Sequence, residues 1–251
     1  MRKILTIIIA SILFTTKIFA QVGEYRNKYS IGIGGGYTLN RIGFLPTVTQ
    51  NMHGGYTCGL TARYTCEKYF STLCAVQMEV NMTQLGWRER IETIDGAPVI
   101  NPDAGTVEEY QRDQTYIQIP IFAHLSWGKE SNGINGFINL GPQIGINTGE
   151  KTKKNYELPF TSKNYPDTYD SQSGRVNAVV AQETMPIENK FDYGIAVGAG
   201  IEWHIKHFGR LNLEGRYYYG LGNIYGDSKR DYFGASNHNT IFIKFSYLCD
   251  L

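Results

Sequence analysis

The segment FDYGIAVGAGIEWH (residues 191–204) alternates strictly between large apolar residues and small or polar ones. One face of an extended chain would carry Phe191, Tyr193, Ile195, Val197, Ala199, Ile201 and Trp203, and the other Asp192, Gly194, Ala196, Gly198, Gly200, Glu202 and His204. A period of two residues is typical of a β-strand with one apolar face. A strand that crosses a membrane at a tilt needs about 9–11 such residues. The segment is therefore long enough to be a membrane-spanning strand.

The same alternation recurs in seven further segments, at residues 29–37, 56–64, 76–83, 117–127, 138–147, 211–221 and 240–247. The connections after the second, fourth and sixth strands are short, whereas the others are long and polar, and the longest runs from about Thr148 to Lys190. A soluble β-sandwich also alternates, but it gives no reason for short and long connections to take turns. We therefore predict an all-β fold, an eight-stranded antiparallel up-and-down transmembrane β-barrel with both termini in the periplasm.

The first residues have the features of a cleaved secretory signal peptide. Arg2 and Lys3 are followed by a short apolar run at residues 4–14 and by the small residue Ala20. A positive start, a short apolar run and a small residue at the cleavage site define such peptides. We expect residues 1–20 to be the signal peptide and residues 21–251 to be one barrel domain in the outer membrane of a Gram-negative bacterium.

Charge and hydropathy exclude two classes of protein. Without Arg2, Lys3 and Lys17, 21 basic residues remain against 23 acidic ones, which leaves no basic surface for nucleic acid. After residue 20 no run of about 18 apolar residues occurs, so helical membrane spans are excluded. We expect a monomer whose surroundings are outer-membrane lipid.

Aromatic residues favour the ends of the predicted strands. Those near the short turns are Tyr64, Trp127, Trp203 and Tyr247, and those toward the long loops are Tyr37, Tyr56, Trp87, Phe191 and Tyr219. Aromatic girdles at both membrane surfaces have this placement. Pro120 interrupts one strand, and because a closed barrel has no free edge we predict a local bulge there.

The cysteines and histidines lack the spacing that is typical of a metal site or a catalytic site. Cys58, Cys66, Cys74 and Cys249 lack metal-ligand spacing; Cys66 and Cys74 either form a disulfide across a hairpin or fill space as small apolar residues. We expect His53, His207 and His238 to be solvated in loops and turns, and His124 and His204 to point inward near the periplasmic rim. We predict no catalytic residue, no metal site and no cofactor, because no nucleophile elbow, paired-histidine or calcium-loop motif occurs.

Six charged residues are expected to meet inside the barrel. Arg63, Glu79, Glu202, Glu214, Arg216 and Lys244 all lie on inward faces at similar distances from the short turns. An eight-stranded barrel has room only for side chains, and charges buried there have to be paired. We predict a structural, salt-bridged plug, and a proton relay or ion path is the alternative.

The ordered motifs of several strands resemble those of the PorT-like outer-membrane β-barrel family over residues 25–251. The residues that carry the resemblance are Tyr116, Ile119, Pro120, Gly141, Pro142, Gly194, Arg216, Tyr217, Gly220 and Asn223. The resemblance implies an eight-stranded outer-membrane barrel, and it implies either a link to the type IX secretion pathway or no assigned role. The chain departs from the usual aromatic ending, since four residues follow Tyr247.

These observations predict a non-enzymatic barrel with a structural or secretion-accessory role, which would touch secretion-machinery or surface proteins through its rims. The first alternative is a ligand-binding or adhesion barrel, because a connection as long as residues 148–190 is often functional. The second alternative is an outer-membrane hydrolase, which would need a Ser-His or Asp-His pair at the outer rim.

Overall fold

The computed structural model describes residues 23–92, 96–101, 105–129, 132–156, 181–206, 208–226 and 233–251. The predicted signal peptide, residues 157–180 of the long connection and His207 lie outside these residues. The elements are β1 (Glu24–Leu45), β2 (Gln50–Asn51), β3 (His53–Tyr69), β4 (Thr72–Arg90), β5 (Glu109–Trp127), β6 (Gly133–Lys154), α3 (Ala181–Thr184), β7 (Phe191–Ile205), β8 (Gly209–Asn223) and β9 (Ala235–Asp250).

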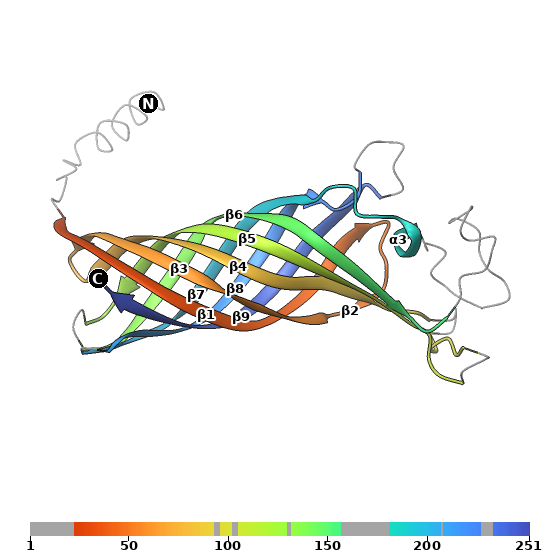
Figure 1. Cartoon of the computed structure of the whole chain (residues 1–251), viewed down its shortest axis with the longest axis horizontal. Coiled ribbons are helices and arrows are strands. Elements are labelled where there is room, and N and C mark those ends of the chain that lie inside the picture. The colour runs from red at the N-terminus through yellow and green to blue at the C-terminus, as the bar shows by residue number, and fades with distance from the viewer. Residues whose placement is uncertain are drawn as a thin grey trace, which may run out of the picture.

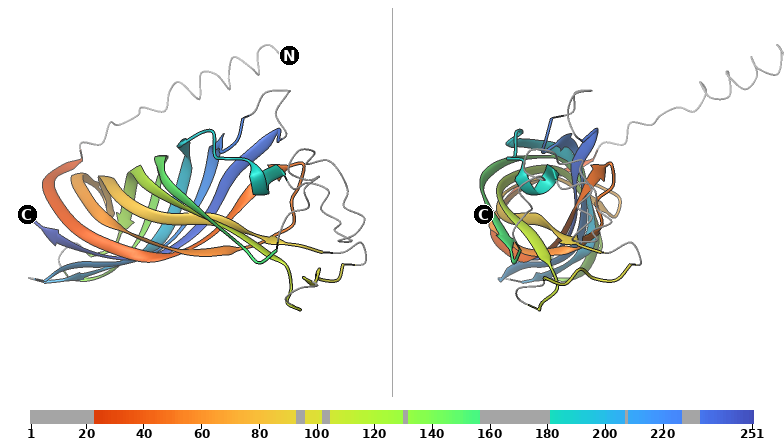
Figure 2. Two further views of the ribbon diagram at one scale, coloured as in Figure 1. Left: turned by 45° about the vertical axis from the view of Figure 1, so that its right-hand side comes forward. Right: turned by 90° about the vertical axis from the view of Figure 1, so that its right-hand side faces the viewer.

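The eight long strands form a closed ring (Figures 1 and 2). Their order is β4, β3, β1, β9, β8, β7, β6 and β5, and pairing between β4 and β5 closes the ring. Every pair is antiparallel. β2 pairs only with the end of β4 and adds no strand to the ring. The predicted eight-stranded up-and-down barrel is confirmed.

The connections alternate in length as predicted. The strand ends that flank the short connections at residues 70–71, 128–132 and 206–208 lie at one end of the barrel, and both ends of the described chain lie there too (Figure 1). Several strands are longer than their apolar alternation indicated. β6 reaches Lys154, so the prediction that the long connection begins at Thr148 is wrong. The strand continues because Gly149 to Lys154 still pair with β5, although polar residues break the alternation there.

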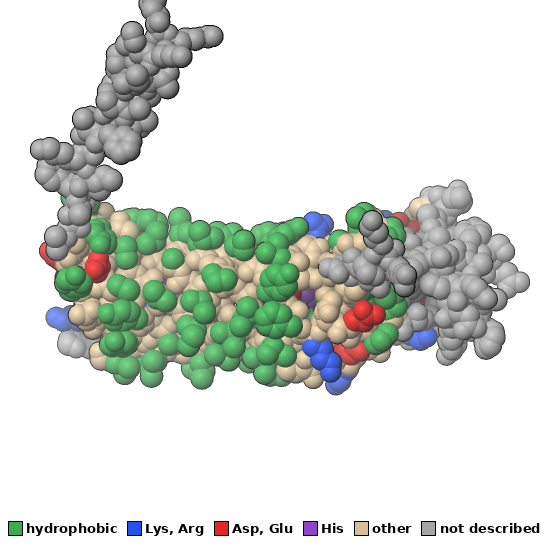
Figure 3. Space-filling view, turned by 90° about the horizontal axis from the view of Figure 1, so that it is seen from above, with side chains coloured by type: hydrophobic (Ala, Val, Ile, Leu, Met, Phe, Trp, Pro, Cys, Tyr) green, Lys and Arg blue, Asp and Glu red, His purple; other side chains and the backbone are tan. Residues whose placement is uncertain are grey.

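The apolar face of the strands points outward. Exposed apolar side chains cover the middle of the barrel, and charged residues gather toward its two ends (Figure 3). The predicted outward residues of β4 are Val76, Met78, Val80 and Met82, and all four are exposed. Among the described residues, no helix is long and apolar enough to cross a membrane.

One residue of the predicted girdles is misplaced. Trp87 is fully buried, whereas Tyr37, Tyr56, Phe191 and Tyr219 at the same end are exposed. Trp87 shares the inward parity of Glu79 on β4, and apolar residues face inward near the mouth of the barrel. Assigning Trp87 to the lipid face was wrong because aromatic character alone does not determine which side of a strand a residue occupies.

The predicted bulge at Pro120 does not occur. The register between β5 and β6 is the same on both sides of Pro120, and the shift lies instead between Thr115 and Tyr116. Between β4 and β5, the pairs Met78–Ile121 and Asn81–Gln118 are present, and the two ladder pairs that would lie between them are missing without a change of register. The missing N–H of proline is therefore accommodated by lost ladder bonds, and no extra residue is inserted.

The four cysteines are free. Cys66 sits at a register shift between Thr65 and Glu67, and Glu67 takes the position opposite Cys74. The bulge moves the two thiols out of register. Of the two interpretations of Cys66 and Cys74, the structure shows the one without a disulfide.

Candidate functional site

Glycines on the inner face make room for long side chains in the lumen. A Cβ at Gly198 would lie 2.2 Å from Oε1 of Glu214, and one at Gly34 would lie 2.9 Å from Cε of Lys244. Both distances are shorter than ordinary van der Waals contacts. The small residues of the alternating pattern thus create the grooves in which charged side chains lie.

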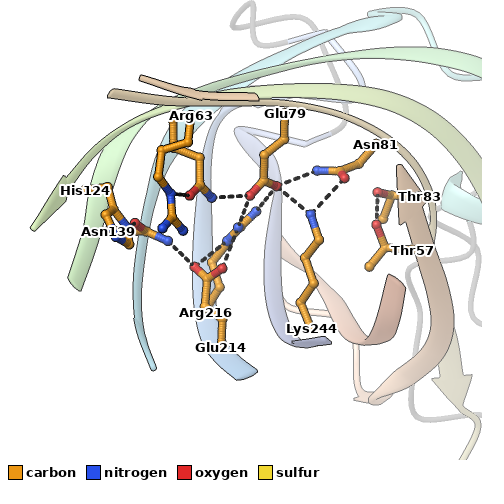
Figure 4. Close-up of polar contacts among 11 residues, drawn as sticks. Thr57, Arg63, Glu79, Asn81, Thr83, His124, Asn139, Glu214, Arg216 and Lys244 are labelled. Atoms are coloured by element: carbon orange, nitrogen blue, oxygen red, sulfur yellow. Dashed lines mark hydrogen bonds and ion pairs between the residues drawn. The ribbon is translucent and has the colours of Figure 1, made fainter. Parts of the chain in front are cut away.

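Arg216 of β8 is the centre of the lumen charge cluster, which comprises Arg63, Glu79, Glu202, Glu214, Arg216 and Lys244. Its guanidinium donates to both carboxylate oxygens of Glu79, at 2.9 and 3.0 Å, and to both of Glu214, at 2.8 and 3.0 Å (Figure 4). The guanidinium carbon also lies 4.5 Å from the ring centroid of Phe122. Two bidentate ion pairs and an aromatic face account for most of the contacts that a guanidinium makes.

Glu79 of β4 is held by more than one cation. Lys244 Nζ lies 2.7 Å from its Oε2, and Gln77 and Asn81 each donate an amide hydrogen bond to its carboxylate. Lys244 also donates to Asn81 Oδ1 at 3.0 Å (Figure 4). The carboxylate and the ammonium are both almost fully buried. Such burial is tolerated because every charge has an opposite charge and further polar partners.

Arg63 and Glu202 form a second ion pair nearer the short turns. Arg63 also donates to Gln77 at 2.9 Å, and since Gln77 bonds Glu79, the two ion-paired groups are one network. The structure thus brings all six predicted residues together.

Arg210 also belongs to this network and was not predicted; its guanidinium approaches Glu202 at 3.6 Å and Asp250 at 3.2 Å. Arg210 has the inward parity of Glu214 and Arg216, so extending the alternation of β8 toward its turn would have found it.

His124, predicted to point inward, is buried and bonds Asn139, whose amide donates to Glu214. His204, also predicted to face inward, is only half-buried and lies 3.8 Å from Asp250. Among the described residues, no three His, Cys, Asp or Glu side chains are placed to share a metal ion.

The opposite end of the lumen is filled by apolar and aromatic side chains, which we call the mouth cluster. Its members are Ile42, Phe44, Val48, Trp87, Ile91, Val99, Tyr110, Tyr156, Ile187, Ile224, Tyr225 and Phe233. α3 lies over this end of the barrel (Figure 2). Arg112 holds the α3 segment in place, because it donates hydrogen bonds to the backbone carbonyls of Gln182 and Met185. It also donates to the hydroxyl of Tyr225.

Two histidines predicted to be solvated are buried on the inner face of the barrel. His53 Nε2 lies 3.2 Å from Asp113, and His238 contacts Asn40 and Tyr116 at 3.3 and 3.2 Å. Both predictions were wrong because the strands extend past the apolar stretches that marked their ends. The His53–Asp113 pair is the kind that a hydrolase would use, but the nucleophile of such a site contacts the histidine, and among the described residues no serine or threonine hydroxyl is hydrogen-bonded to His53.

The model of one protein family, described as "Outer membrane protein beta-barrel domain", matches residues 19–226. The chain belongs to this family. No curated protein matches the sequence.

Several solved structures are similar to this outer membrane beta-barrel domain protein. Neisserial surface protein A is 10% identical with a TM-score of 0.41, over 88% of this chain and 95% of that one. OprG from Pseudomonas aeruginosa is 11% identical with a TM-score of 0.41, over 90% and 98%. Ail, the attachment invasion locus protein of Yersinia pestis, is 10% identical with a TM-score of 0.35, over 89% and 100%. The fold and the outer-membrane location rest on the strand pairing and the family match.

Several motif residues of this outer membrane beta-barrel protein have structural roles. Gly194 lies where a Cβ would come 2.8 Å from the ring of Tyr218, and a Cβ at Gly220 would come 3.3 Å from Asp192. Asn223 accepts a hydrogen bond from the backbone of Ser236 at 2.8 Å, which joins β8 to β9. These contacts explain the residues by packing and strand pairing, without reference to a partner.

Proposed function

We propose that this protein is a non-enzymatic outer-membrane barrel with a structural or accessory role, closed to solutes, which anchors an extracellular surface for contact with other proteins. In this proposal the short turns and both termini are periplasmic, the mature protein begins after residue 20 as a single domain, and the barrel is a monomer. The PorT-like resemblance adds secretion machinery as a class of partner. The hydrolase alternative has no further support in the contacts of His53.

The filling of the lumen is the observation that carries the proposal. The lumen charge cluster occupies one part of it, the mouth cluster occupies the outer end, and Phe122, Ala196, Tyr218 and Phe242 pack together beside Arg216. A barrel of eight strands is just wide enough to be filled in this way. A protein so filled serves as an anchor rather than as a pore.

We expect purified wild-type protein in planar lipid bilayers to pass little or no current. The ion-paired residues Glu79, Arg216 and Lys244 would have to separate before an ion could pass, and separating buried charges is costly. The same preparation should shift in mobility on boiling, which shows that the barrel was folded. A steady, large conductance from folded monomer would contradict the closed barrel and favour the proton-relay or ion-path alternative.

Deleting the gene is expected to remove several proteins from the surface and secreted fractions, because a secretion accessory serves many cargo proteins. The measurement is a comparison of both proteomes with the parent strain, and complementation with the intact gene is the control. A change limited to the binding of one external ligand would instead support the adhesion alternative.

A further inference from the structure

Three strands extend beyond the rest of the barrel at its mouth. We call this extension the crown; it consists of residues 84–90 of β4, 109–115 of β5 and 149–154 of β6. The ends of β4, β5 and β6 reach further from the short turns than those of β7 and β8 (Figure 1). The crown is therefore a three-stranded antiparallel sheet with two edges of its own.

One edge of the crown is covered by the chain itself. β2 pairs with β4 through Gln50–Glu89 and Asn51–Arg88, and the backbone N–H of Arg90 donates to the carbonyl of Thr49 at 2.9 Å. Residues 88–90 of β4 thus have backbone partners on this side, and the carbonyls of Gln84 and Gly86 accept hydrogen bonds from the side chains of Thr38 and Asn40.

The other edge, on β6, is open within the described part of the chain. Pairing with β7 ends at Ile146–Phe191, and the N–H of Asn147 donates to Lys190 just beyond it. Residues 148–154 are all exposed, and no described strand pairs with them on the side away from β5. Unpaired backbone groups on an exposed edge are a template for another strand.

The open edge is basic. Lys151, Lys153 and Lys154 lie on it, Lys190 lies next to Asn147 where the edge begins, and the one carboxylate of the edge, Glu150, is paired with Arg112 at 2.9 Å. Lys153 is paired with Asp113 at 3.0 Å, whereas Lys151, Lys154 and Lys190 make no ion pair with any described residue. Lysines along an edge oppose pairing with a second copy of the same edge, because like charges would face each other.

We propose that the open edge of β6 binds an extended, acidic polypeptide segment of another protein as an added strand. Backbone hydrogen bonds to residues 148–154 supply the attachment, and the lysines select the acidic sequence. The inference rests on the proposed function, because it needs the crown to be held outside the cell by a closed barrel.

The test uses the full mature barrel in lipid nanodiscs and a fluorescent eight-residue peptide that alternates Glu with Val. Binding should be detectable by fluorescence anisotropy and should weaken with added salt. Amide hydrogen exchange in residues 148–154 should slow on binding, whereas exchange at β2 should not change. A peptide methylated at alternate backbone nitrogens should not bind, since it cannot complete a ladder of hydrogen bonds.

The double variant K151E/K154E should weaken binding about tenfold or more, because two attractive charges become repulsive. The matched control is Arg41→Glu on β1, an exposed basic residue on the opposite side of the ring, and it should bind as the wild type does. Heat-dependent mobility confirms that each variant is folded.

Three results would overturn the proposal: equal binding of an alternating Lys and Val peptide, no binding of the Glu and Val peptide by folded wild type, or slow exchange, before peptide is added, of those amides of residues 148–154 that point away from β5. Self-association of the wild type through this edge would also overturn it, in favour of a second copy as occupant. Because none of these results depends on conductance, failure of this inference is distinguishable from failure of the closed barrel.

Discussion

The variant Arg216→Ala is expected to lower the free energy of unfolding by about 3–5 kcal/mol, the usual cost of removing one partner from a buried ion pair. Glu79 would keep Lys244, but Glu214 would keep only the amide of Asn139 among its described side-chain partners. The uncompensated charge of Glu214 is the main source of the loss. Urea unfolding of the barrel in lipid vesicles, followed by tryptophan fluorescence, measures it.

Arg88→Ala is the matched control, because Arg88 and Glu109 form the same kind of pair at 2.7 Å with side chains 43% and 56% exposed. Exposed pairs contribute about 0.2–1 kcal/mol, so this variant should be close to the wild type. Removing Glu214 together with Arg216 should recover part of the loss, since the unpaired carboxylate is gone. Equal effects of Arg216→Ala and Arg88→Ala would show that the lumen charges are not desolvated.

The lumen charges could be predicted from sequence because a strand in a barrel has only two faces. Once Ile195 and Val197 of β7 are assigned to the lipid side, Glu202 must face inward. The apolar residues of β8 and β9 place Arg216 and Lys244 on the inner face in the same way. Counting residues along each strand from its short turn then places Glu202, Arg216 and Lys244 at similar heights in the barrel. The pairing of Arg216 with two carboxylates at once was beyond this argument, since it depends on side-chain rotamers across the lumen.

The mouth cluster could not be predicted in this way. Ile42 and Phe44 lie at the end of β1 on its inner face, where the sequence analysis had stopped at Tyr37. Arg41 interrupts the outward apolar pattern there, because the strand has left the lipid. The contacts of Arg112 with the α3 segment join residues about 70 positions apart, and local periodicity carries no information on such pairs.

Trp87→Ala is expected to cost about 3–5 kcal/mol, as for other large aromatic residues removed from a packed core. The Trp87 ring packs edge-on against Phe44 at 5.5 Å and lies 6.3 Å from Tyr110, and Arg112 sits 5.6 Å from its centroid. The cavity left behind would loosen the hold of Arg112 on the α3 segment. We therefore expect faster amide exchange at Gln182 and Met185 together with the lower free energy of unfolding.

The position of Trp87 can also be tested without loss of stability. In the double variant Trp127→Phe and Trp203→Phe, Trp87 is the remaining tryptophan, and brominated lipids should quench its fluorescence far less than that of the wild type. Trp127 and Trp203 are 37% and 52% exposed on the lipid side, whereas Trp87 is fully buried. Quenching as strong as in the wild type would place Trp87 in the girdle, and Trp87→Ala would then cost no more than Tyr56→Ala on the outer face.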